Sequence, residues 1–383
     1  MKILVLGAGR MGLGAAYDLA HNSPEVSSVT VADLDGERAR AVCDTVDSPK
    51  LTHAQIDVED AAGVVELMRG HDAVVSCVTY FHNLKLARAA IEARTNFCDL
   101  GGNNAVVAAE LALDEDARAA GVNIIPDCGL APGMVAVLAA HGAERFDEIE
   151  AIHIRVGGLP LAPKPPLNYQ IVFSVEGLIN EYVERARVVR GGQIIDVESM
   201  TEMEELEFPA PFGRMEAFQT SGGTSTLPDT FAGRIQELDY KTIRYPGHCA
   251  QFKLLIDLGL AASDEVDLGH ARVAPRRLLG ELLVRHLPAD EPDVVLVRLE
   301  FRGMQNGVQR QLRYDIIDRF DERTGLSAMM RTTAFPASIV AQTMARGATT
   351  KKGALPQELC IPTAPFVAAL ASRDINLEES FPD

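Results

Sequence analysis

The sequence is poor in cysteine and has no long apolar run. Its six cysteines, at positions 43, 77, 98, 128, 249 and 360, form no CxxC pair and no cluster with histidine. This favours reduced thiols over a disulfide framework or a zinc site. The apolar run that follows Met1, residues 3–6, is too short for a signal peptide or a membrane-spanning helix. We therefore expect a cytoplasmic protein with no metal site.

Basic side chains are scarce relative to acidic ones. The 383 residues include 36 Lys and Arg against 54 Asp and Glu, which gives a formal net charge of −18 at pH 7. This charge repels phosphate groups, so we expect no nucleic-acid and no membrane partner. Hydrophobic residues make up 47% and charged residues 23% of the chain, which is typical of a globular protein. The length favours two domains.

The first 130 residues alternate short apolar runs with amphipathic stretches. The apolar runs are residues 2–7, 28–33, 72–78, 95–102 and 122–129, and helical patterns cover residues 83–94 and 105–121. Uninterrupted apolar runs of this length are typical of buried parallel strands. Alternation with helices predicts right-handed crossovers, and so a doubly wound parallel α/β sheet over residues 1–130.

The pattern changes after residue 130. The segment 160–166 has four prolines in seven residues, which excludes a central strand there. Later segments are typical of antiparallel strands, and Asn306-Gly307 is a strong hairpin signal. We predict a second α+β domain over residues 131–334, built on a largely antiparallel sheet whose edges suit a homo-oligomer. A helical pattern over 335–347 suggests that residues 335–383 pack back onto the first domain.

A glycine pattern lies between the first strand and the first helix. Gly7, Gly9 and Gly12 form GxGxxG, and Asp33 ends the second strand about 20 residues later. This order predicts a Rossmann dinucleotide site, because the glycines admit a pyrophosphate and the acid binds the ribose hydroxyls. Asp33 would repel a 2′-phosphate, which favours NAD over NADP, although Arg38 or Arg40 could offset that repulsion. A glycine-rich turn without a nucleotide is the alternative. The predicted cofactor-binding residues are Gly7, Gly9, Arg10, Met11, Gly12, Asp33, Val78 and Thr79.

Titratable side chains follow three of the predicted strands. In open α/β sheets ligands bind at the carboxyl ends of the strands. The candidates for catalytic residues there are Tyr80, His82, Asp99 and Asp127. Each has a structural alternative: Asp99 could cap the next helix, Asp127 could fix a hinge, and Tyr80 and His82 could be packed in a loop.

Several motifs together resemble the saccharopine dehydrogenase-like family. They are GAGRMG, VTYFHN, DLGG, IIPDCGLAPGM, VGGLP, FSVEGL, KTIRYPGH and GALPQE, in this order over nearly the whole chain. Within the family the resemblance is strongest to bacterial lysine 6-dehydrogenases. It implies NAD-dependent oxidative deamination of the ε-amino group of L-lysine in lysine metabolism.

The resemblance also implies a substrate site. Arg244 occupies the position that holds a substrate carboxylate in such enzymes, and a guanidinium can bind a carboxylate through two parallel bonds. Glu176 stands where saccharopine-forming relatives place arginine and serine, so it could pair with an α-ammonium group or simply begin a helix. Lys241, Thr224 and Ser225 either line the same pocket or serve a solvated strand and a glycine turn.

The implied reaction needs a proton acceptor. A lysine ε-amine is protonated at pH 7 and must lose a proton before hydride can leave its carbon. We expect Asp99 to act as the base, then Asp127, then His82. The alternatives are a saccharopine-type or carboxypolyamine-type reductase that acts on a secondary amine, and an NAD-responsive binding protein without turnover.

Overall fold

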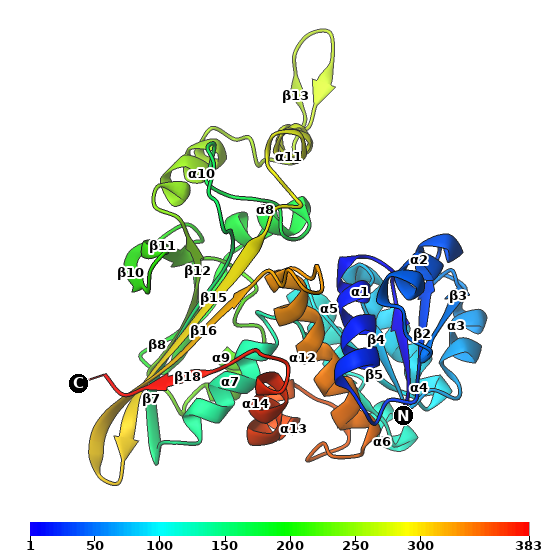
Figure 1. Ribbon diagram of the computed structural model, residues 1–383. Helices are drawn as coiled ribbons and strands as arrows, with labels where there is room; N and C mark the ends of the chain where they lie inside the picture. The colour runs from blue at the N-terminus through cyan, green and yellow to red at the C-terminus, as the bar shows by residue number, and fades with distance from the viewer. Residues whose placement is uncertain (383) are drawn as a thin grey trace. The chain divides into compact units, whose positions relative to one another are not determined.

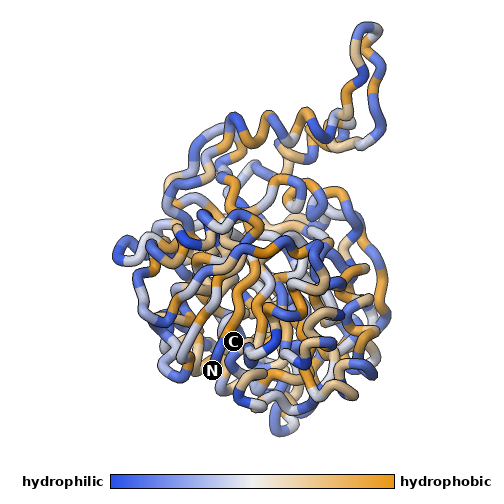
Figure 2. The backbone as a smooth tube through the Cα atoms, turned by 90° about the vertical axis from the view of Figure 1, so that its right-hand side faces the viewer, coloured by the Kyte–Doolittle hydropathy of each residue, from blue (hydrophilic) through white to orange (hydrophobic). Residues whose placement is uncertain are grey.

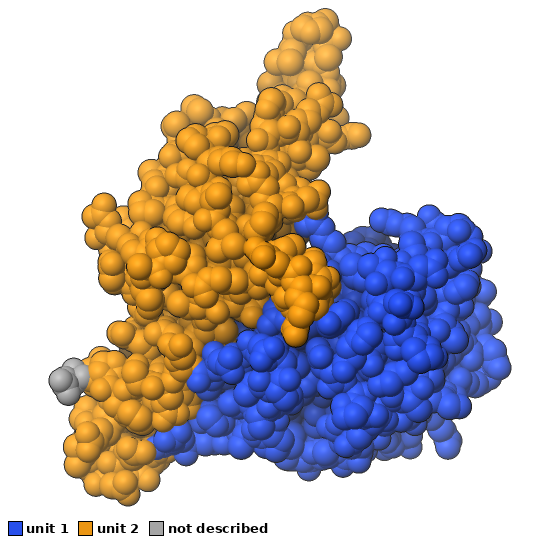
Figure 3. Space-filling view, in the orientation of Figure 1, with its two compact units in different colours: residues 1–145, 225–230, 330–377 blue, residues 146–224, 231–329, 378–383 orange. Residues whose placement is uncertain are grey.

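The chain divides into two units (Figure 3). The computed structural model describes residues 1–382. Unit 1 comprises residues 1–145, 225–230 and 330–377, and unit 2 comprises most of the remainder. The predicted domain boundary at residue 130 precedes helix α7 (Met134–Ala143), whereas the unit boundary follows it. The difference arises because α7 is apolar on nearly every face and is buried in unit 1, where it packs against α13 (Gln357–Cys360) and α14 (Thr363–Ala371).

Unit 1 is built on a seven-stranded sheet with the order β17-β6-β5-β4-β1-β2-β3 (Figure 1). All of its strand pairs are parallel. The strands are β1 (Lys2–Leu6), β2 (Ser28–Asp33), β3 (Leu51–Gln55), β4 (Ala73–Ser76), β5 (Asn96–Asp99), β6 (Asn123–Ile125) and β17 (Gly353–Ala354). The predicted doubly wound sheet is thereby confirmed. The sequence did not reveal β3, because this edge strand is half exposed and lacks the apolar run of its neighbours.

The helices of unit 1 cover both faces of this sheet. They are α1 (Arg10–Tyr17), α2 (Gly36–Val46), α3 (Ala61–Met68), α4 (Asn83–Ala93), α5 (Asn104–Leu111), α6 (Asp114–Ala120), α7, α13, α14 and most of α12 (Ala328–Ala345). The helical pattern over 105–121 folds into two helices rather than one. The chain turns between them at Leu113, whose buried side chain packs in the apolar core.

Unit 2 is built on a mixed sheet with the order β10-β11-β12-β7-β15-β16-β18, and β8 and β9 extend it beside β12. Its strands are β7 (Glu148–Pro160), β8 (Ala186–Arg190), β9 (Gln193–Val197), β10 (Glu204–Phe208), β11 (Gly213–Gln219), β12 (Glu237–Arg244), β15 (Asp293–Gln305), β16 (Val308–Arg319) and β18 (Glu378–Ser380). The pair β12–β7 is parallel and the other pairs are antiparallel. The predicted α+β unit on a largely antiparallel sheet is confirmed.

Three helices and a small hairpin complete unit 2. The helices are α8 (Val175–Val183), α10 (His248–Asp257) and α11 (Pro275–His286). The strands β13 (Val266–Asp267) and β14 (Arg272–Val273) form a hairpin that projects beside α11 (Figures 1 and 2). Its Val266 and Leu268 side chains are about half exposed.

Asn306-Gly307 forms the predicted hairpin turn. β15 ends at Gln305, β16 begins at Val308, and the two strands pair along their whole length. Both turn residues have positive φ, 53° and 74°, as a two-residue turn between twisted strands requires.

Helix α12 begins seven residues earlier than predicted. Apolar residues at helical spacing indicated a start at residue 335, whereas α12 begins at Ala328 and Pro336 lies inside the helix. The first turn is held by Asp293, whose two carboxylate oxygens accept hydrogen bonds from the N–H groups of Ala328 and Met329 at 2.7 and 2.9 Å. A cap from a residue 35 positions away leaves no local signal in the sequence.

A buried carboxylate, Asp239 on β12, links strands β12, β7 and β8 of unit 2. It accepts hydrogen bonds from His153 Nδ1 at 2.8 Å, Arg155 Nη1 at 2.7 Å and Arg190 Nη2 at 2.8 Å. Burial opposes its ionisation, but the bonds from His153 and Arg155 outweigh burial and hold the pKa of Asp239 well below its usual range.

This network predicts a loss of stability in acid. Because the folded-state pKa of Asp239 is depressed, its stabilisation is fully present above the unfolded-state pKa of about 3.9 and is lost as pH falls below that value. Asp239→Asn should lower the free energy of unfolding at pH 7 by about 3 kcal/mol, since it leaves buried guanidinium groups without their counter-charge. Urea denaturation at pH 7 and pH 3 measures both effects. Glu205→Gln, which removes the exposed pair with Arg214, is the matched control and should change stability by less than about 1 kcal/mol. Equal losses in the two variants would contradict the expectation.

Candidate functional site

The GxGxxG loop has the geometry of a pyrophosphate site. Gly7 has φ +98°, and a Cβ on Gly12 would lie 1.8 Å from the carbonyl oxygen of Gly7. A Cβ on Gly9 would meet nothing within 4 Å. The loop leads directly into α1, which begins at Arg10. The N–H groups of the first helical turn and the open space over Gly9 fit the phosphates of a dinucleotide.

Asp33 and the loop after β4 lie beside these glycines. The Asp33 carboxylate accepts a hydrogen bond from the N–H of Ala8 at 2.6 Å, which places it at the glycine loop. A Cβ on Gly7 would lie 3.2 Å from Val78 Cγ1 and 2.9 Å from the backbone of Cys77, so residues 77 and 78 also lie beside the loop. The predicted cofactor residues Asp33 and Val78 therefore meet at one loop, and the residues present fit a bound dinucleotide.

Two of the predicted catalytic residues, Asp99 and Asp127, come together in unit 1. Asp99 Oδ1 accepts hydrogen bonds from the N–H groups of Gly101 at 2.6 Å and of Asp127 at 3.3 Å. Asp99 is fully buried and Asp127 is 5% exposed. Helix α5 is capped by Asn103, so the alternative role of Asp99 as its cap does not hold. Asp127 has φ 61°, a strained value that functional residues often show.

A third carboxyl group, that of Glu110 on α5, belongs to this cluster. It is fully buried, and neither of its oxygens nor Asp99 Oδ2 has a hydrogen-bond donor on another described residue. Burial, reinforced by the charge of Asp99, raises the pKa of Glu110 strongly, so this group is held protonated at neutral pH. Because Glu110 stays neutral, it adds no second negative charge beside Asp99.

Burial also makes Asp127 a weak acid. Burial first, and the charge of Asp99 second, raise the pKa of Asp127 to about 7, while the hydrogen bond from Ser225 opposes the rise. The side-chain amide of Gln357 donates to the backbone carbonyl of Asp127. A carboxyl group that titrates near neutral pH is suited to general acid–base catalysis.

Tyr80 and His82 lie in a short 3-10 turn, η2 (Tyr80–His82), after β4. The Tyr80 ring packs against Gly102, where a Cβ would come within 3.1 Å of it, so Tyr80 lies beside the segment that follows Asp99. His82 instead forms an ion pair with Glu59 at 2.9 Å, and Lys85 binds the same carboxylate. This placement supports an ordinary surface role for His82.

Arg244, on β12 of unit 2, carries a buried guanidinium group. It is 3% exposed, its Nε donates to Tyr182 Oη at 2.8 Å and its Nη1 donates to the carbonyl of Ile243 at 2.9 Å. Its guanidinium lies 4.8 Å from the centre of the Tyr169 ring. Among the described residues no carboxylate lies within ion-pair distance of it. A buried cation without a counter-charge is costly, and this suggests that its partner is a ligand.

A chain of hydrogen bonds orients Arg244. The guanidinium can only donate, so Tyr182 Oη accepts from it and directs its own hydrogen to His248 Nε2, 3.0 Å away. His248 Nδ1 then donates to the carbonyl of Leu167 at 3.0 Å. Burial first, and Arg244 second, lower the pKa of His248 to about 3, which keeps the imidazole neutral as this arrangement requires.

The other predicted substrate residues are separated from Arg244 or bonded elsewhere. Lys241 is an odd number of positions from Arg244 on β12, so it lies on the opposite face of the sheet, where it pairs with Glu204 at 3.3 Å. Glu176 is exposed and pairs with Arg276 at 2.7 Å. The Thr224 hydroxyl donates to the carbonyl of Arg187. The structure thus argues against substrate contacts by Lys241 and Glu176.

Ser225 belongs to unit 1 rather than to the surroundings of Arg244. Its hydroxyl donates to Asp127 Oδ2. This contact assigns it to the carboxyl cluster, where it supports the ionised form of Asp127.

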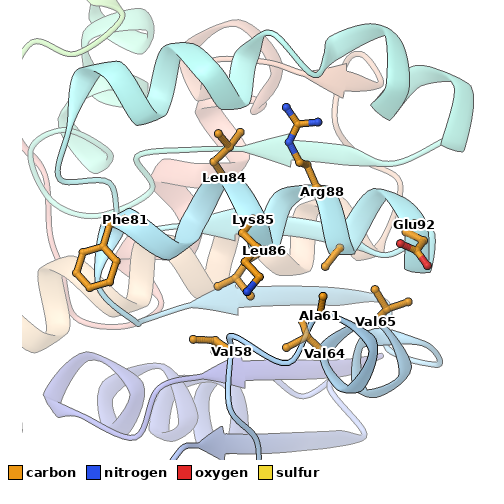
Figure 4. Close-up of a pocket in the computed structure, with 11 residues that line it drawn as sticks. Val58, Ala61, Val64, Val65, Phe81, Leu84, Lys85, Leu86, Arg88 and Glu92 are labelled. Atoms are coloured by element: carbon orange, nitrogen blue, oxygen red, sulfur yellow. The ribbon is translucent and has the colours of Figure 1, made fainter.

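A separate cavity of about 370 Å³ lies between α3 and α4 (Figure 4). Its walls are mainly apolar and also include the charged residues Lys85, Arg88 and Glu92. None of the predicted catalytic or cofactor residues lines it, so it is not the candidate active site.

Sequence reasoning missed Glu110, Tyr182 and His248. Glu110 lies in an ordinary helical pattern, and nothing local indicates that its carboxyl group meets Asp99. Tyr182 and His248 are 66 residues apart and meet only in the fold. The closest signal was the position of His248 in the KTIRYPGH motif.

The glycine loop predicts a selective loss of cofactor binding. Gly9→Ala should fold normally, because a Cβ there meets no protein atom, but it should weaken dinucleotide binding at least tenfold, because that space is where the phosphates lie. Titration calorimetry and thermal unfolding separate the two effects. Gly280→Ala on α11, where a Cβ makes only an ordinary contact at 3.7 Å, is the control. Unchanged affinity in Gly9→Ala would remove this loop from the cofactor site.

Comparison with solved structures shows the same fold. The apo saccharopine dehydrogenase (L-Glu forming) from Saccharomyces cerevisiae superposes with a TM-score of 0.82 at 18% identity, covering 100% of both chains. The homospermidine synthase from Legionella pneumophila, solved in complex with NAD, has a TM-score of 0.68 at 13% identity, covering 100% of this chain and 91% of that one.

Comparison of sequences extends this likeness. The saccharopine dehydrogenase (NADP(+), L-glutamate-forming) of Pyricularia oryzae is 25% identical over 278 residues, 68% of this chain and 60% of that protein. The carboxynorspermidine synthase of Vibrio cholerae is 26% identical over 175 residues, 40% and 42% of the two chains. The chain thus spans less than two thirds of the length of these relatives. No described helix is long and apolar enough to cross a membrane.

Family models cover almost the whole chain. Residues 3–125 match the saccharopine dehydrogenase NADP binding domain, and residues 129–375 match the saccharopine dehydrogenase C-terminal domain. The motifs, the fold and these matches agree, and the chain therefore belongs to the saccharopine dehydrogenase family.

Proposed function

We propose that this chain is an NAD-dependent dehydrogenase that oxidises the ε-amino group of L-lysine. The observation that carries the proposal is Arg244, a buried guanidinium with no carboxylate partner among the described residues. Such a group suits the α-carboxylate of an amino acid, which it can bind through two hydrogen bonds. The dinucleotide loop and the buried carboxyl cluster of unit 1 supply the other two requirements of an amine dehydrogenase.

The cofactor proposed is NAD. The Asp33 carboxylate lies at the end of β2 against the glycine loop, where it would bind ribose hydroxyls and repel a 2′-phosphate. Arg40 does not fold back toward that position, since it pairs with Asp44 on α2. When bound, NAD would accept the hydride that leaves the ε-carbon of lysine.

We propose that the carboxyl cluster of unit 1 accepts the proton that the ε-ammonium group of lysine must lose. The ε-ammonium group must first lose a proton so that its nitrogen lone pair can form the C=N bond as hydride leaves. Asp127, with its pKa near 7, can accept that proton at neutral and alkaline pH. Asp99 binds the N–H of Asp127 and holds it in place, and protonated Glu110 limits the negative charge of the cluster. Water then adds to the iminium carbon and ammonia leaves, which yields the semialdehyde, or the α-amine closes a ring.

The carboxylate role of Arg244 gives a direct kinetic prediction. Arg244→Ala should raise KM for L-lysine by about 10- to 100-fold, the worth of a charge-assisted hydrogen bond, and leave the Kd for NAD unchanged. Steady-state kinetics and calorimetry measure the two constants. Lys241→Met, on the opposite face of β12, is the matched control and should keep KM within about threefold. An unchanged KM for L-lysine in Arg244→Ala would exclude this role.

The pKa of Asp127 predicts the pH dependence of catalysis. A general base works only when ionised, so kcat/KM for L-lysine should fall as pH drops below about 7. Asp127→Asn should lower kcat by about 100-fold or more and flatten this acid limb. Ser225→Ala removes the hydrogen bond that favours the ionised form, so it should shift the limb toward higher pH. If the acid limb of the kcat/KM profile keeps its wild-type position in both variants, a group other than Asp127 is the base.

A related reaction is the second candidate. The saccharopine dehydrogenases and carboxynorspermidine synthase among the relatives bear names of enzymes that handle secondary amines. Assays of L-lysine with NAD, with and without 2-oxoglutarate, distinguish oxidative deamination from such a reaction. NAD binding without NADH formation from any amine would instead support a binding protein.

Self-association into a homo-oligomer stays a prediction, which light scattering can test.

A further inference from the structure

A second ionisable group accompanies Arg244 in unit 2. Glu181, on α8, precedes Tyr182, whose hydroxyl accepts the hydrogen bond from Arg244 Nε. The backbone carbonyl of Glu181 accepts a hydrogen bond from the N–H of Ser221 at 2.9 Å, which ties this turn of α8 to the hydroxyl-rich loop 220–226. Glu181 is therefore adjacent in the chain to the residue that orients the guanidinium, and its backbone is anchored to the loop.

The Glu181 carboxylate has no partner of its own. It is only partly exposed, and no described residue donates a hydrogen bond to its side chain or forms an ion pair with it. It interacts electrostatically with Arg244, Tyr169 and Tyr240, so these groups surround one small region. Burial raises the pKa of Glu181 to about 7, although Arg244 opposes the rise.

Arg244 and Glu181 are close but do not pair. Neighbouring opposite charges in a protein interior ordinarily form an ion pair with hydrogen bonds, because each is costly to leave unpaired. Here the guanidinium is held by Tyr182 and by the carbonyl of Ile243, and the carboxylate lies beyond ion-pair distance. A ligand that carries a carboxylate and an ammonium group on one carbon would satisfy both charges at once.

We propose that Glu181 binds the α-ammonium group of the amino-acid substrate while Arg244 binds its α-carboxylate. This assignment rests on the proposed function and deepens it, since it makes the site specific for α-amino acids rather than for amines in general. The sequence suggested Glu176 for the ammonium group, but Glu176 is exposed and pairs with Arg276. We assign this role to Glu181, five residues further along the same helix.

The side chains around the two charges favour this ligand. The Tyr169 ring lies against the guanidinium at 4.8 Å, and the Tyr240 ring packs on Gly223, where a Cβ would come within 2.4 Å of it. Aromatic walls exclude water and so strengthen both charge-assisted bonds. They also attract cations, which adds to the binding of an ammonium group.

The test compares L-lysine with 6-aminohexanoate, which has the same carboxylate and ε-amine but no α-ammonium group. Binding of each ligand to the NADH-loaded chain, which has no hydride acceptor and so cannot turn over, is measured by calorimetry for the wild type, Glu181→Gln and Glu176→Gln. Glu181→Gln should weaken L-lysine binding by about 10- to 100-fold, the worth of a hydrogen bond to a charged group, and change 6-aminohexanoate binding by less than about threefold. Glu176→Gln should change neither.

Each outcome decides the assignment. An equal loss for both ligands in Glu181→Gln indicates a merely structural role and overturns the proposal, as does unchanged discrimination between them. Failure of the wild type to bind either ligand overturns it too. Because binding is measured without turnover, a wild type that binds L-lysine through Glu181 but forms no NADH would refute the proposed function alone.

Discussion

The cost of burying ionisable groups away from water governs both candidate regions of this protein. In unit 1 the cost falls on Asp99, Glu110 and Asp127, which are buried and form no ion pair with a cationic side chain among the described residues. In unit 2 it falls on Arg244, which is buried with no carboxylate partner among the described residues. Backbone N–H groups hold Asp99, a hydroxyl holds Asp127, and a hydroxyl and an aromatic ring hold Arg244, in place of a counter-charge.

The consequence in unit 1 is a cluster that can exchange protons. Three buried carboxyl groups cannot all be ionised, so burial drives their pKa values upward and sets Asp127 near neutrality. Gly101 allows this crowding, since a Cβ at that position would come within 1.8 Å of Asp127 Oδ1. The close approach of the backbone therefore positions the carboxyl group that titrates in the useful range.

The consequence in unit 2 is a pair of opposite charges that are kept apart. Tyr182 and His248 form a chain of hydrogen bonds whose directions are fully determined, because a guanidinium can only donate and a neutral imidazole has one acceptor. This chain holds Arg244, which forms no ion pair with Glu181. The unit thus keeps two unsatisfied charges ready for one zwitterionic ligand, in contrast to Asp239, whose charge is fully satisfied within the sheet.

The alternation of side chains along β12 is one feature of the site that the sequence alone contains. The strict alternation of side chains along β12 places Tyr240, Thr242 and Arg244 on one face and Lys241 on the other, and the contact of Thr242 with Thr220 at 2.8 Å agrees with this division. Counting positions along the strand would have separated Lys241 from Arg244. No count could have assigned Ser225 to Asp127, because the two are 98 residues apart.

The sequence by itself determined the doubly wound sheet, the glycine loop with Asp33, the hairpin at Asn306-Gly307 and the family, because these depend on local periodicity, turn chemistry and motif order. Only the tertiary structure decided which ionisable groups are partners. It brought Glu110 to Asp99, gave Glu176 to Arg276, and left Arg244 and Glu181 unpaired beside each other. The reason is physical: a charge is satisfied or left free by neighbours that are distant along the chain, and burial, which sets its energy, exists only in the fold.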